Sequence, residues 1–459
     1  MVDTFLKMLY NCNIQEVGNL LVKLSKGASF VIENLHKNGY LAYAVGGCVR
    51  DSLLGNTPYD FDITTSAKPS DVKSIFEKTY DTGIAHGTVT ISVFGEHLEV
   101  TTFRADGEYL NNRKPQSVTL IDDVSQDLAR RDFTINAICY NDTEGIIDLF
   151  NGIDDLNNKI IRAIGDPKKR FTEDALRILR AVRFSAQLGF EIEENTKKAI
   201  KECAPLIKNL SVERIISEID KIIMSDSPMH LKLLFDLGVL SYIMPEMCDC
   251  FLQAQNTRWH IYDVGTHSIN VIKNSPKKLY LRYAALMHDW GKPHCHAINE
   301  LGEDSFRNHA KVSYELSQKF MKKYKFSNEN SDKILRLVKN HDREILLQKK
   351  YIKRAINTVG TDIFLDLIHL KRADCLSQNL ELTKERLPYL DKLENLYNEI
   401  KAGNEAFSLK NLAVNGRDII SLGYEGKEVG IILNCLLEFV IDNPQENEKE
   451  KLLKIAKEL

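Results

Sequence analysis

Residues 43–65 have the sequence YAVGGCVRDSLLGNTPYDFDITT, and this stretch decides how the first third of the chain folds. The apolar residues before Gly46 and Gly47 predict a strand, and CVRDSLLG after them predicts a short helix. A glycine pair at such a turn leaves backbone N–H groups open to an anion, because no Cβ blocks close approach. Arg50 follows one helical turn later, so the stretch predicts an anion-binding turn.

The end of the same stretch carries two carboxylates. Asp60 and Asp62 flank Phe61, and alternate residues of a strand face the same side, so both acids converge while Phe61 turns toward the core. Neighbouring carboxylates repel one another unless a cation lies between them. Taken alone, the pair is usually a turn or a solvent-facing feature. Together with the glycine turn it predicts a Mg²⁺ site, with Glu99 of the alternating segment HLEVTTF as a candidate third catalytic carboxylate.

The pattern around this stretch changes once along the chain. Residues 40–162 contain β-rich segments broken by Gly, Pro and Asp, whereas from Phe171 onward apolar residues recur at helical spacing. The fold expected is an α/β head with a small mixed or antiparallel sheet, followed by an all-α body. The predicted divisions are 1–30 as a helical extension, 31–165 as the head, 166–260 as a helical neck, 261–380 as a metal domain and 381–459 as a helical tail.

Composition narrows the class of protein. The 459 residues are 43% hydrophobic and 27% charged, as in soluble globular proteins of several domains. No run approaches the roughly 20 apolar residues that cross a bilayer, and no secretory leader is apparent. The nine cysteines form neither a disulfide framework nor a CxxC zinc pattern, so we expect a cytoplasmic protein. The net charge of −3 does not itself point to a nucleic-acid partner.

Residues 173–184, EDALRILRAVRF, predict one helix with a polar stripe. Asp174, Arg177, Arg180 and Arg183 recur every three residues, with apolar residues between them. Without further context, the plainer interpretation is a solvated helix face with an Asp174–Arg177 ion pair that contributes little stability.

Four motifs in order resemble one enzyme family. VGGCVRD with YDFDITT, DLARRDFTINAI (127–138), DLFNGIDDL (148–156) and EDALRILRAVRF are similar to motifs of the polymerase β nucleotidyltransferase superfamily. Within it they resemble the branch of class II tRNA nucleotidyltransferases and bacterial poly(A) polymerases. The resemblance continues through SVERIISEIDKII to the tail segment VNGRDIISLGYEGKEVGIILNCLLE, and so covers essentially the whole chain.

This resemblance implies an activity and a set of roles. The expected enzyme adds the 3′-terminal CCA to tRNA from CTP and ATP, releases pyrophosphate and uses two-metal catalysis. Asp174 and Arg177 would bond the Watson–Crick edge of the incoming base, since a carboxylate accepts from the amine that cytosine and adenine share. Arg131, Arg180 and Arg183 would contact the nucleotide, chiefly its phosphates.

Residues 102–124, TFRADGEYLNNRKPQSVTLIDDV, predict a long exposed loop. In the family this segment resembles a flexible loop required for the switch from CTP to ATP, and enzymes that add only CC look shortened there. The segment here keeps a full-looking length with Arg104, Tyr109 and Arg113, which favours complete CCA addition.

A histidine-rich stretch runs from Trp259 to Asp374. Its segments LMHDWGK and KRADC resemble motifs of the HD phosphohydrolase superfamily, whose metal ligands come from separate helices of a bundle. A single buried histidine is more often a packed core residue, but six positions in the superfamily's order favour a divalent metal site. The resemblance implies His267, His288, Asp289 and Asp374 as ligands, with His309 and His341 for a possible second metal.

Several alternatives stay open at this point. A bacterial poly(A) polymerase shares every head motif, and a partial tRNA nucleotidyltransferase would add only CC or only A. An HD-type metal phosphohydrolase with a nucleotide-binding head is a rival from another class of enzyme. A non-catalytic tRNA-binding protein is a third, against which the intact Asp60 and Asp62 argue.

Overall fold

The structure is a computed structural model that describes residues 22–107, 109–110, 114–115, 118–403 and 408–459. Most of the predicted extension over residues 1–30 therefore lies outside the described residues. The chain forms two compact units, Met1–Ile219 with Asp236–Ile243, and Asp220–Phe235 with Met244–Leu459. The five predicted divisions remain predictions.

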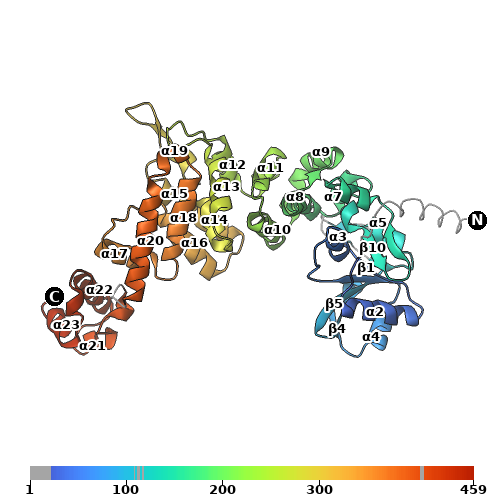
Figure 1. The fold of residues 1–459 in the computed structure, drawn as a ribbon, viewed down its shortest axis with the longest axis horizontal. Helices are drawn as coiled ribbons and strands as arrows, with labels where there is room; N and C mark the ends of the chain where they lie inside the picture. The colour runs from blue at the N-terminus through green and yellow to red at the C-terminus, as the bar shows by residue number, and fades with distance from the viewer. Residues whose placement is uncertain (1–21, 108, 111–113, 116–117, 404–407) are drawn as a thin grey trace, which may run out of the picture. The chain divides into compact units, whose positions relative to one another are not determined.

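The first unit is built on a seven-stranded sheet (Figure 1). Its strand order is β11-β10-β1-β2-β5-β4-β3, and every neighbouring pair is antiparallel except β2 with β5. The mixed sheet confirms the predicted class of head. The strands are β1 Ala42–Val45, β2 Asp62–Thr65, β3 Thr79–Gly83, β4 Thr88–Val93, β5 Glu96–Thr102, β10 Ile138–Asn141 and β11 Gly145–Asp148.

Short helices complete the head. α2 contacts β1, β2 and β5, and begins where the Ser25 side chain accepts a hydrogen bond from the Ala28 backbone N–H. One apolar core includes Tyr43 and Val45 of β1, Phe103 after β5, and Cys139 of β10. The head helices are α2 Lys26–Lys37, α3 Gly47–Leu53, α4 Pro69–Ile75, α5 Val124–Ala129 and α6 Gly152–Asn157.

The segment expected to be a long loop contains paired strands instead. β6 (Arg104–Asp106) pairs with β9 (Val118–Leu120), and β7 (Tyr109–Leu110) pairs with β8 (Lys114–Pro115). Strands of two or three residues are too short to give a periodic sequence signal, which is why the pattern predicted a loop. Arg113 lies outside the described residues.

The helical neck differs from the prediction at one place. Residues 173–184 are not one helix: α7 spans Pro167–Glu173, Asp174 has an extended backbone with φ −137° and ψ 104°, and α8 spans Leu176–Leu188. α7 begins where Asp166 caps it through the Lys168 backbone N–H and Pro167 opens the helix, and at the break the Asp174 side chain accepts from the Leu176 backbone N–H at the start of α8. The neck continues with α9 Glu194–Cys203 and α10 Val212–Met224, beside a short pairing of β12 Ile160–Ile161 with β13 Glu191–Ile192.

The second unit is helical apart from one small hairpin, β14 (Ala297–Ile298) with β15 (Asp304–Ser305), and this confirms the predicted all-α body. Among its described residues, as in the rest of the described chain, no helix is long and apolar enough to span a membrane. The helices are α11 His230–Asp236, α12 Pro245–Leu252, α13 Val264–Asn274, α14 Leu279–Met287, α15 His309–Lys323, α16 Asn328–Asn340, α17 Lys349–Val359, α18 Phe364–Leu376, α19 Leu380–Thr383, α20 Arg386–Ala402, α21 Gly416–Ile420, α22 Lys427–Asp442 and α23 Lys449–Ala456.

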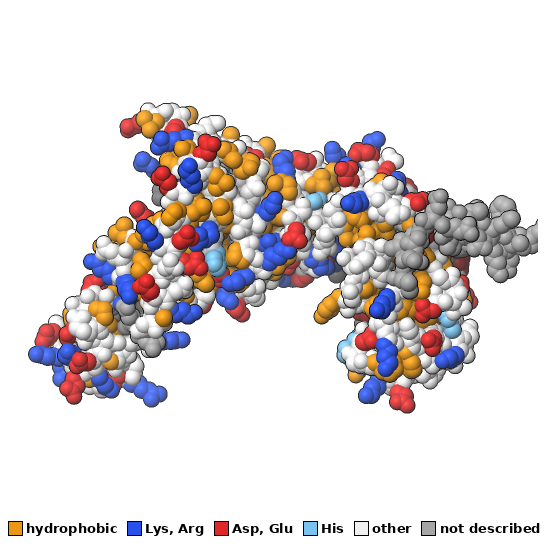
Figure 2. Space-filling model, in the orientation of Figure 1, with side chains coloured by type: hydrophobic (Ala, Val, Ile, Leu, Met, Phe, Trp, Pro, Cys, Tyr) orange, Lys and Arg blue, Asp and Glu red, His pale blue; other side chains and the backbone are white. Residues whose placement is uncertain are grey.

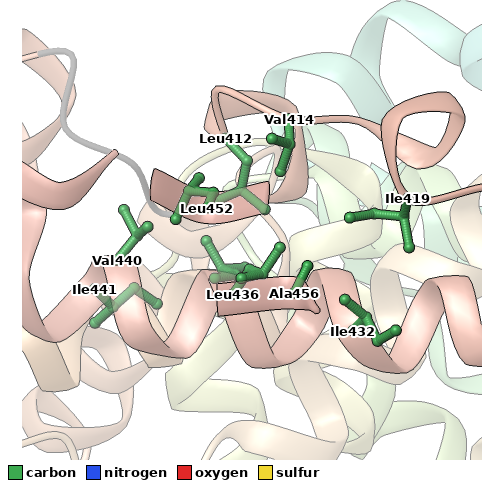
Figure 3. Close-up of a cluster of buried hydrophobic side chains, with 10 residues drawn as sticks. Leu412, Val414, Ile419, Ile432, Leu436, Val440, Ile441, Leu452 and Ala456 are labelled. Atoms are coloured by element: carbon green, nitrogen blue, oxygen red, sulfur yellow. The ribbon is translucent and has the colours of Figure 1, made fainter. Parts of the chain in front are cut away.

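The end of the chain has an apolar core of its own (Figure 3). Ile432, Leu436 and Val440 recur every four residues along one face of α22 and are buried against Leu452 of α23 and Ile419 of α21. Burial of each such side chain contributes roughly 1.5–3 kcal/mol, so this core holds the short terminal helices together.

Candidate functional site

The first site lies where β2 begins. Phe61 is buried, whereas Asp60 and Asp62 on either side of it are exposed. β2 runs parallel to β5 with Asp62 directly opposite Glu99, which is also exposed. Asp62 and Glu99 therefore lie side by side on two neighbouring strands, whereas Asp60, expected within the strand, lies two residues before β2 begins.

The electrostatics of this group suit a cation. Desolvation is the largest influence on Asp62 and raises its pKa; Arg131 opposes this, and the charges of Asp60 and Glu99 add to it, so the pKa lies above its ordinary value. A bound cation would reverse the balance, because it favours the charged form of every carboxylate around it. This donor set of oxygen ligands fits Mg²⁺.

The glycine turn lies next to this group. Gly46 has φ +81°, a backbone conformation that residues other than glycine rarely adopt, and it precedes the first turn of α3 at Gly47. A Cβ built on Gly46 would lie 3.4 Å from Nη1 of Arg131. Nε of Arg131 is buried and has no hydrogen-bond partner among the described residues. The turn and Arg131 thus combine open backbone with an incompletely satisfied guanidinium.

Arg50 is engaged within the protein. Its buried guanidinium donates to Oδ1 of Asp51 at 2.8 Å and to Oδ1 of Asn136 at 2.7 Å. Asn136 in turn donates to Asp132 at 3.1 Å. Arg50 therefore ties helix α3 to the segment 132–136 in this structure, and a contact with an anion would require these bonds to rearrange.

Two buried acids, Asp127 and Asp132, organise the arginines. Asp127 accepts from Arg130 Nη2 at 2.7 Å and from Thr64 of β2 at 3.1 Å. Asp132 accepts from Nε of Arg180 at 2.7 Å. Burial alone would raise the pKa of Asp132, but the charge of Arg180 and the hydrogen bonds from Asn136 and Arg180 together outweigh it and lower the pKa to about 2. Both acids belong to the motif DLARRDFTINAI, but the sequence alone predicted no role for either of them.

The base-selecting pair predicted from sequence is held by neighbours. Oδ1 of Asp174 accepts from the Leu176 backbone N–H at 3.1 Å, and Oδ2 accepts from Nη2 of Arg214 at 2.8 Å. Arg177 does not pair with Asp174; it donates to Glu173 at 2.8 Å and to the Arg130 carbonyl at 2.7 Å. Both groups are thereby fixed in orientation.

The other two arginines of α8 differ in exposure. The Arg180 side chain is 34% exposed, while that of Arg183 is 9% exposed and donates to Glu218 at 2.6 Å and to Gln187 at 2.9 Å. Glu218 and Arg214 both come from α10, which sequence reasoning did not connect to this site. The two arginines are thus not equivalent in their access to a ligand.

The second site gathers the predicted histidines in the helical unit. Two groups of side chains could each hold a metal ion, one of His267, His288 and Asp289, the other of Asp289, His309 and His341. Asp289 belongs to both groups. Asp374 joins the first group, with Oδ1 2.9 Å from Nε2 of His267. All six predicted positions therefore meet in space.

The four histidines are oriented in the same way. Each Nδ1 lies within hydrogen-bond distance of a backbone carbonyl oxygen, and each Nε2 faces the carboxylates. Such bonds fix the ring and leave Nε2 as the ligand atom. The Nδ1 partners are Ser377 at 3.3 Å for His267, Ala285 at 2.7 Å for His288, Phe306 at 2.8 Å for His309 and Val338 at 2.8 Å for His341.

Several atoms of this group fit a metal ion. Nε2 of His267 and Nε2 of His288 are buried without an aligned hydrogen bond among the described residues, and each faces a carboxylate, Asp374 Oδ1 at 2.9 Å and Asp289 Oδ2 at 3.1 Å. Burial lowers the pKa of His341 to about 3, so its ring is neutral and free to bind metal. Lys292 lies 2.7 Å from Asp289 and 2.8 Å from Gln255, and partly offsets the acidic charge.

A cavity of about 380 Å³ opens beside the second group of ligands. Its lining includes His309, Lys292, Arg307 and the aromatic residues Trp259 and Phe306. His260 also lines it; burial lowers the pKa of this ring to about 3. Sequence reasoning missed His260 and Gln255, whose only signal was their position just before the first histidine ligand.

Three protein-family models match successive parts of the chain, from the head through the neck to the helical unit. Residues 42–162 match the model described as the Poly A polymerase head domain. Residues 189–251 match a probable RNA and SrmB- binding site of polymerase A, and residues 260–379 match the HD domain.

Individual proteins match almost the whole chain. A CCA-adding enzyme of Lactobacillus helveticus is 35% identical over 437 residues, which cover 94% of this chain and 96% of that protein. A crystal structure of the Bacillus stearothermophilus CCA-adding enzyme in complex with CTP is similar at 30% identity and a TM-score of 0.72, covering 94% of this chain and 96% of that chain. The Thermotoga maritima CCA-adding enzyme complexed with tRNA_CCA shares the fold, at 19% identity and a TM-score of 0.57. The match covers 95% of this chain and 96% of that chain.

Proposed function

The chain belongs to the CCA-adding enzymes, and from this membership we propose which of its residues carry out the reaction. The enzyme adds the 3′-terminal CCA to tRNA from CTP and ATP and releases pyrophosphate. The match to CCA-adding enzymes over 94% of the chain carries this conclusion, and it favours CCA addition over the poly(A) polymerase alternative.

Asp60, Asp62 and Glu99 are proposed as the catalytic carboxylates. The enzyme uses a divalent metal, and the oxygen donors of the head favour Mg²⁺. When bound, the metal would lower the pKa of the tRNA 3′-hydroxyl and stabilise the pyrophosphate leaving group. The support is the strand register, which sets Asp62 opposite Glu99, together with the raised pKa of Asp62.

Phosphate binding is proposed for the glycine turn and its arginines. Gly46 and Gly47 present open backbone, and Arg131 lies against the turn with an unsatisfied Nε. Arg180 keeps exposed donors beside its bond to Asp132. Arg50 and Arg183 are buried and already bonded, so we expect them to support this surface, and a direct contact of either with the nucleotide stays a prediction.

Base selection is proposed for Asp174 and Arg177. The carboxylate would accept from the amine of cytosine or adenine, whereas uracil and guanine offer a carbonyl oxygen at the matching position and would leave it unpaired. The bonds of Asp174 to Leu176 and Arg214 support this role, because a fixed carboxylate discriminates better than a mobile one. Arg177 is fixed in the same manner by Glu173.

The reaction is tested with tRNA transcripts that end at the discriminator base, at C or at CC. Purified protein and Mg²⁺ are supplied with CTP and ATP separately and together, and products are resolved at single-nucleotide length. We expect C, C and then A, with no further extension. Addition of CC alone, or of A alone onto CC, would contradict complete CCA addition, and a long A tract would indicate a poly(A) polymerase.

A second function is proposed for the helical unit: a metal-dependent phosphohydrolase site. Its support is the pair of ligand groups that share Asp289, the buried Nε2 atoms of His267 and His288 that face carboxylates, and the adjoining cavity with Lys292. Metal content measured by elemental analysis, with His288→Ala as the comparison, tests the site. A wild-type protein that retains no divalent metal would contradict it.

We further propose that the protein acts in the cytoplasm. The eight cysteines within the described residues are all free thiols, as a reducing compartment favours.

On the face drawn in Figure 2, acidic and basic side chains intermingle over both units, which agrees with the modest net charge of −3. Binding of tRNA is therefore expected to depend on shape and local arginines more than on overall charge.

A further inference from the structure

Lys371 joins two parts of the metal domain. From α18, its Nζ donates to the backbone carbonyl oxygens of His341 and Arg343, each at 2.7 Å. These carbonyls lie just beyond the end of α16 at Asn340, with His341 as its C-cap residue. The last carbonyls of a helix have no partner within it, and a cation there interacts favourably with the helix dipole. Lys371 thus closes the end of α16.

The closed helix end also sets the direction of the His341 ring. Nδ1 of His341 lies 2.8 Å from the Val338 carbonyl oxygen of the same helix end. Its Nε2 lies 3.0 Å from Nε2 of His309 and 3.7 Å from Oδ1 of Asp289. A shift of the backbone at His341 would therefore move the ligand atom away from the second group.

The same helix carries a ligand of the first group. Asp374 follows Lys371 by three residues on α18, a spacing that sets both side chains on one face of the helix. Asp374 reaches His267 directly at 2.9 Å. One helix therefore supplies a ligand to the first group and a hydrogen-bond donor to the backbone of a ligand in the second.

We propose that Lys371 is a positioning residue for the second metal position, holding His341 in line with His309 and Asp289. This inference rests on the metal binding proposed for the helical unit. Removal of the ammonium group would loosen the second group and leave the first, whose ligands His267 and His288 are held by other carbonyls. Groups that orient metal ligands typically change affinity by about 10- to 100-fold when removed.

Tyr389 offers a matched control. Its hydroxyl donates to the Ile345 carbonyl oxygen from α20, so it braces the same turn after α16, but two residues beyond the last carbonyl that Lys371 holds. Tyr389→Phe removes one donor from the turn without touching the His341 carbonyl. Any general loosening of the turn would appear in both variants, whereas a specific effect on His341 appears only at Lys371.

The test is titration of chelator-stripped full-length protein with Mn²⁺, followed by calorimetry and by the magnetic coupling signal of a dinuclear Mn²⁺ pair. We expect two ions in the helical unit of the wild type and of Lys371→Arg, which keeps the donors, beyond any ion that Asp62→Asn removes from the head. Lys371→Met is expected to bind one ion as the wild type does, to bind the second at least about 10-fold more weakly and to lose the coupling signal; the same loss is expected of His341→Ala.

Three results with the variants would overturn the proposal: two-ion binding by Lys371→Met at wild-type affinity, equal weakening of both ions, or the same loss in Tyr389→Phe. With the wild type, binding of a single ion in the helical unit would overturn it, whereas binding of none there would refute the metal site itself. Should Lys371→Met fail to fold by circular dichroism, Lys371→Gln is titrated in its place against the same expectations.

Discussion

The carboxylate site of the head and the histidine site of the helical unit differ in how far their ionisable side chains are exposed to solvent. In the head, Asp60, Asp62 and Glu99 are exposed, and the latter two face one another across neighbouring strands. In the helical unit, His267, His288 and Asp289 are almost fully buried, and each ring is already aligned by a backbone carbonyl.

The difference reflects what each site has to accept. An open carboxylate face can take up a nucleotide and the end of an RNA chain together with metal, so part of its coordination comes from the substrates. A buried group of histidines and carboxylates can hold metal without any substrate, because its ligands are already gathered. The head should therefore be completed by its substrates, and the helical unit should retain metal alone.

The largest expected effect is at Asp62. Asp62→Asn keeps the size of the side chain but removes a charge from the carboxylate group, and we expect nucleotide addition to fall by about 10³-fold or more. Single-turnover extension of a tRNA transcript measures this. Asp81→Asn, an exposed acid on β3 that pairs with Lys73, is the control and should add nucleotides normally. Activity of Asp62→Asn near the wild-type level would remove the head carboxylates from the mechanism.

Metal should stabilise only an intact histidine site. A divalent ion at about 100 times its Kd contributes about 2.7 kcal/mol to the folded state, and chelation should remove that amount from the helical unit. Thermal unfolding with and without chelator measures the change. His288→Ala should show no response to the chelator, and an equal response in both proteins would place the stabilising metal elsewhere.

The ion pair between the buried Asp132 and the partly exposed Arg180 predicts a pH dependence. The folded pKa of Asp132 is about 2, below its ordinary value of 3.8, so ionised Asp132 stabilises the fold above about pH 4 and loses that contribution as the pH falls toward 2. The shift corresponds to about 2 kcal/mol. Asp132→Asn should cost at least that amount in urea unfolding at pH 7, and the difference should shrink at acid pH. The exposed Asp154→Asn serves as the control.

The smallest expected effect concerns the choice of nucleotide. Asp174→Asn replaces a carboxylate that only accepts by an amide that can also donate, so uracil and guanine gain a partner while cytosine and adenine keep only a weaker, uncharged acceptor. We expect the preference for CTP over UTP to fall by about tenfold, measured as the ratio of incorporation efficiencies. A uniform loss of rate with all four nucleotides would show that Asp174 acts on catalysis and not on selection.

Local patterns in the sequence predicted the head and its carboxylates well. Alternation around Phe61 and the glycine turn at Gly46 depend on residues next to one another, and the structure has both features. The break at Asp174 was missed because the prediction considered only the motif 173–184, whereas the helix that ends at Glu173 begins outside it, after Asp166. The hairpins within 104–120 were missed because their strands are too short for a period to show.

Contacts between distant residues could not be predicted in the same way. Arg180 and Asp132 are 48 residues apart in the sequence, and Arg183 and Glu218 are 35 apart. No local spacing of residues predicts either pair. In the helical unit the candidate ligands were predicted because LMHDWGK and KRADC resemble motifs of the HD superfamily, whereas the lysine behind His341 has no distinctive signal. Sequence patterns thus indicated the reacting groups better than the groups that hold them.

The central claim is that CCA addition depends on the head carboxylates and not on the histidine site. The most direct measurement is the single-nucleotide product ladder from one tRNA transcript with CTP and ATP, compared between Asp62→Asn and His288→Ala. We predict no addition by Asp62→Asn and a complete C, C, A ladder with His288→Ala. A ladder lost in His288→Ala but retained in Asp62→Asn would contradict the account.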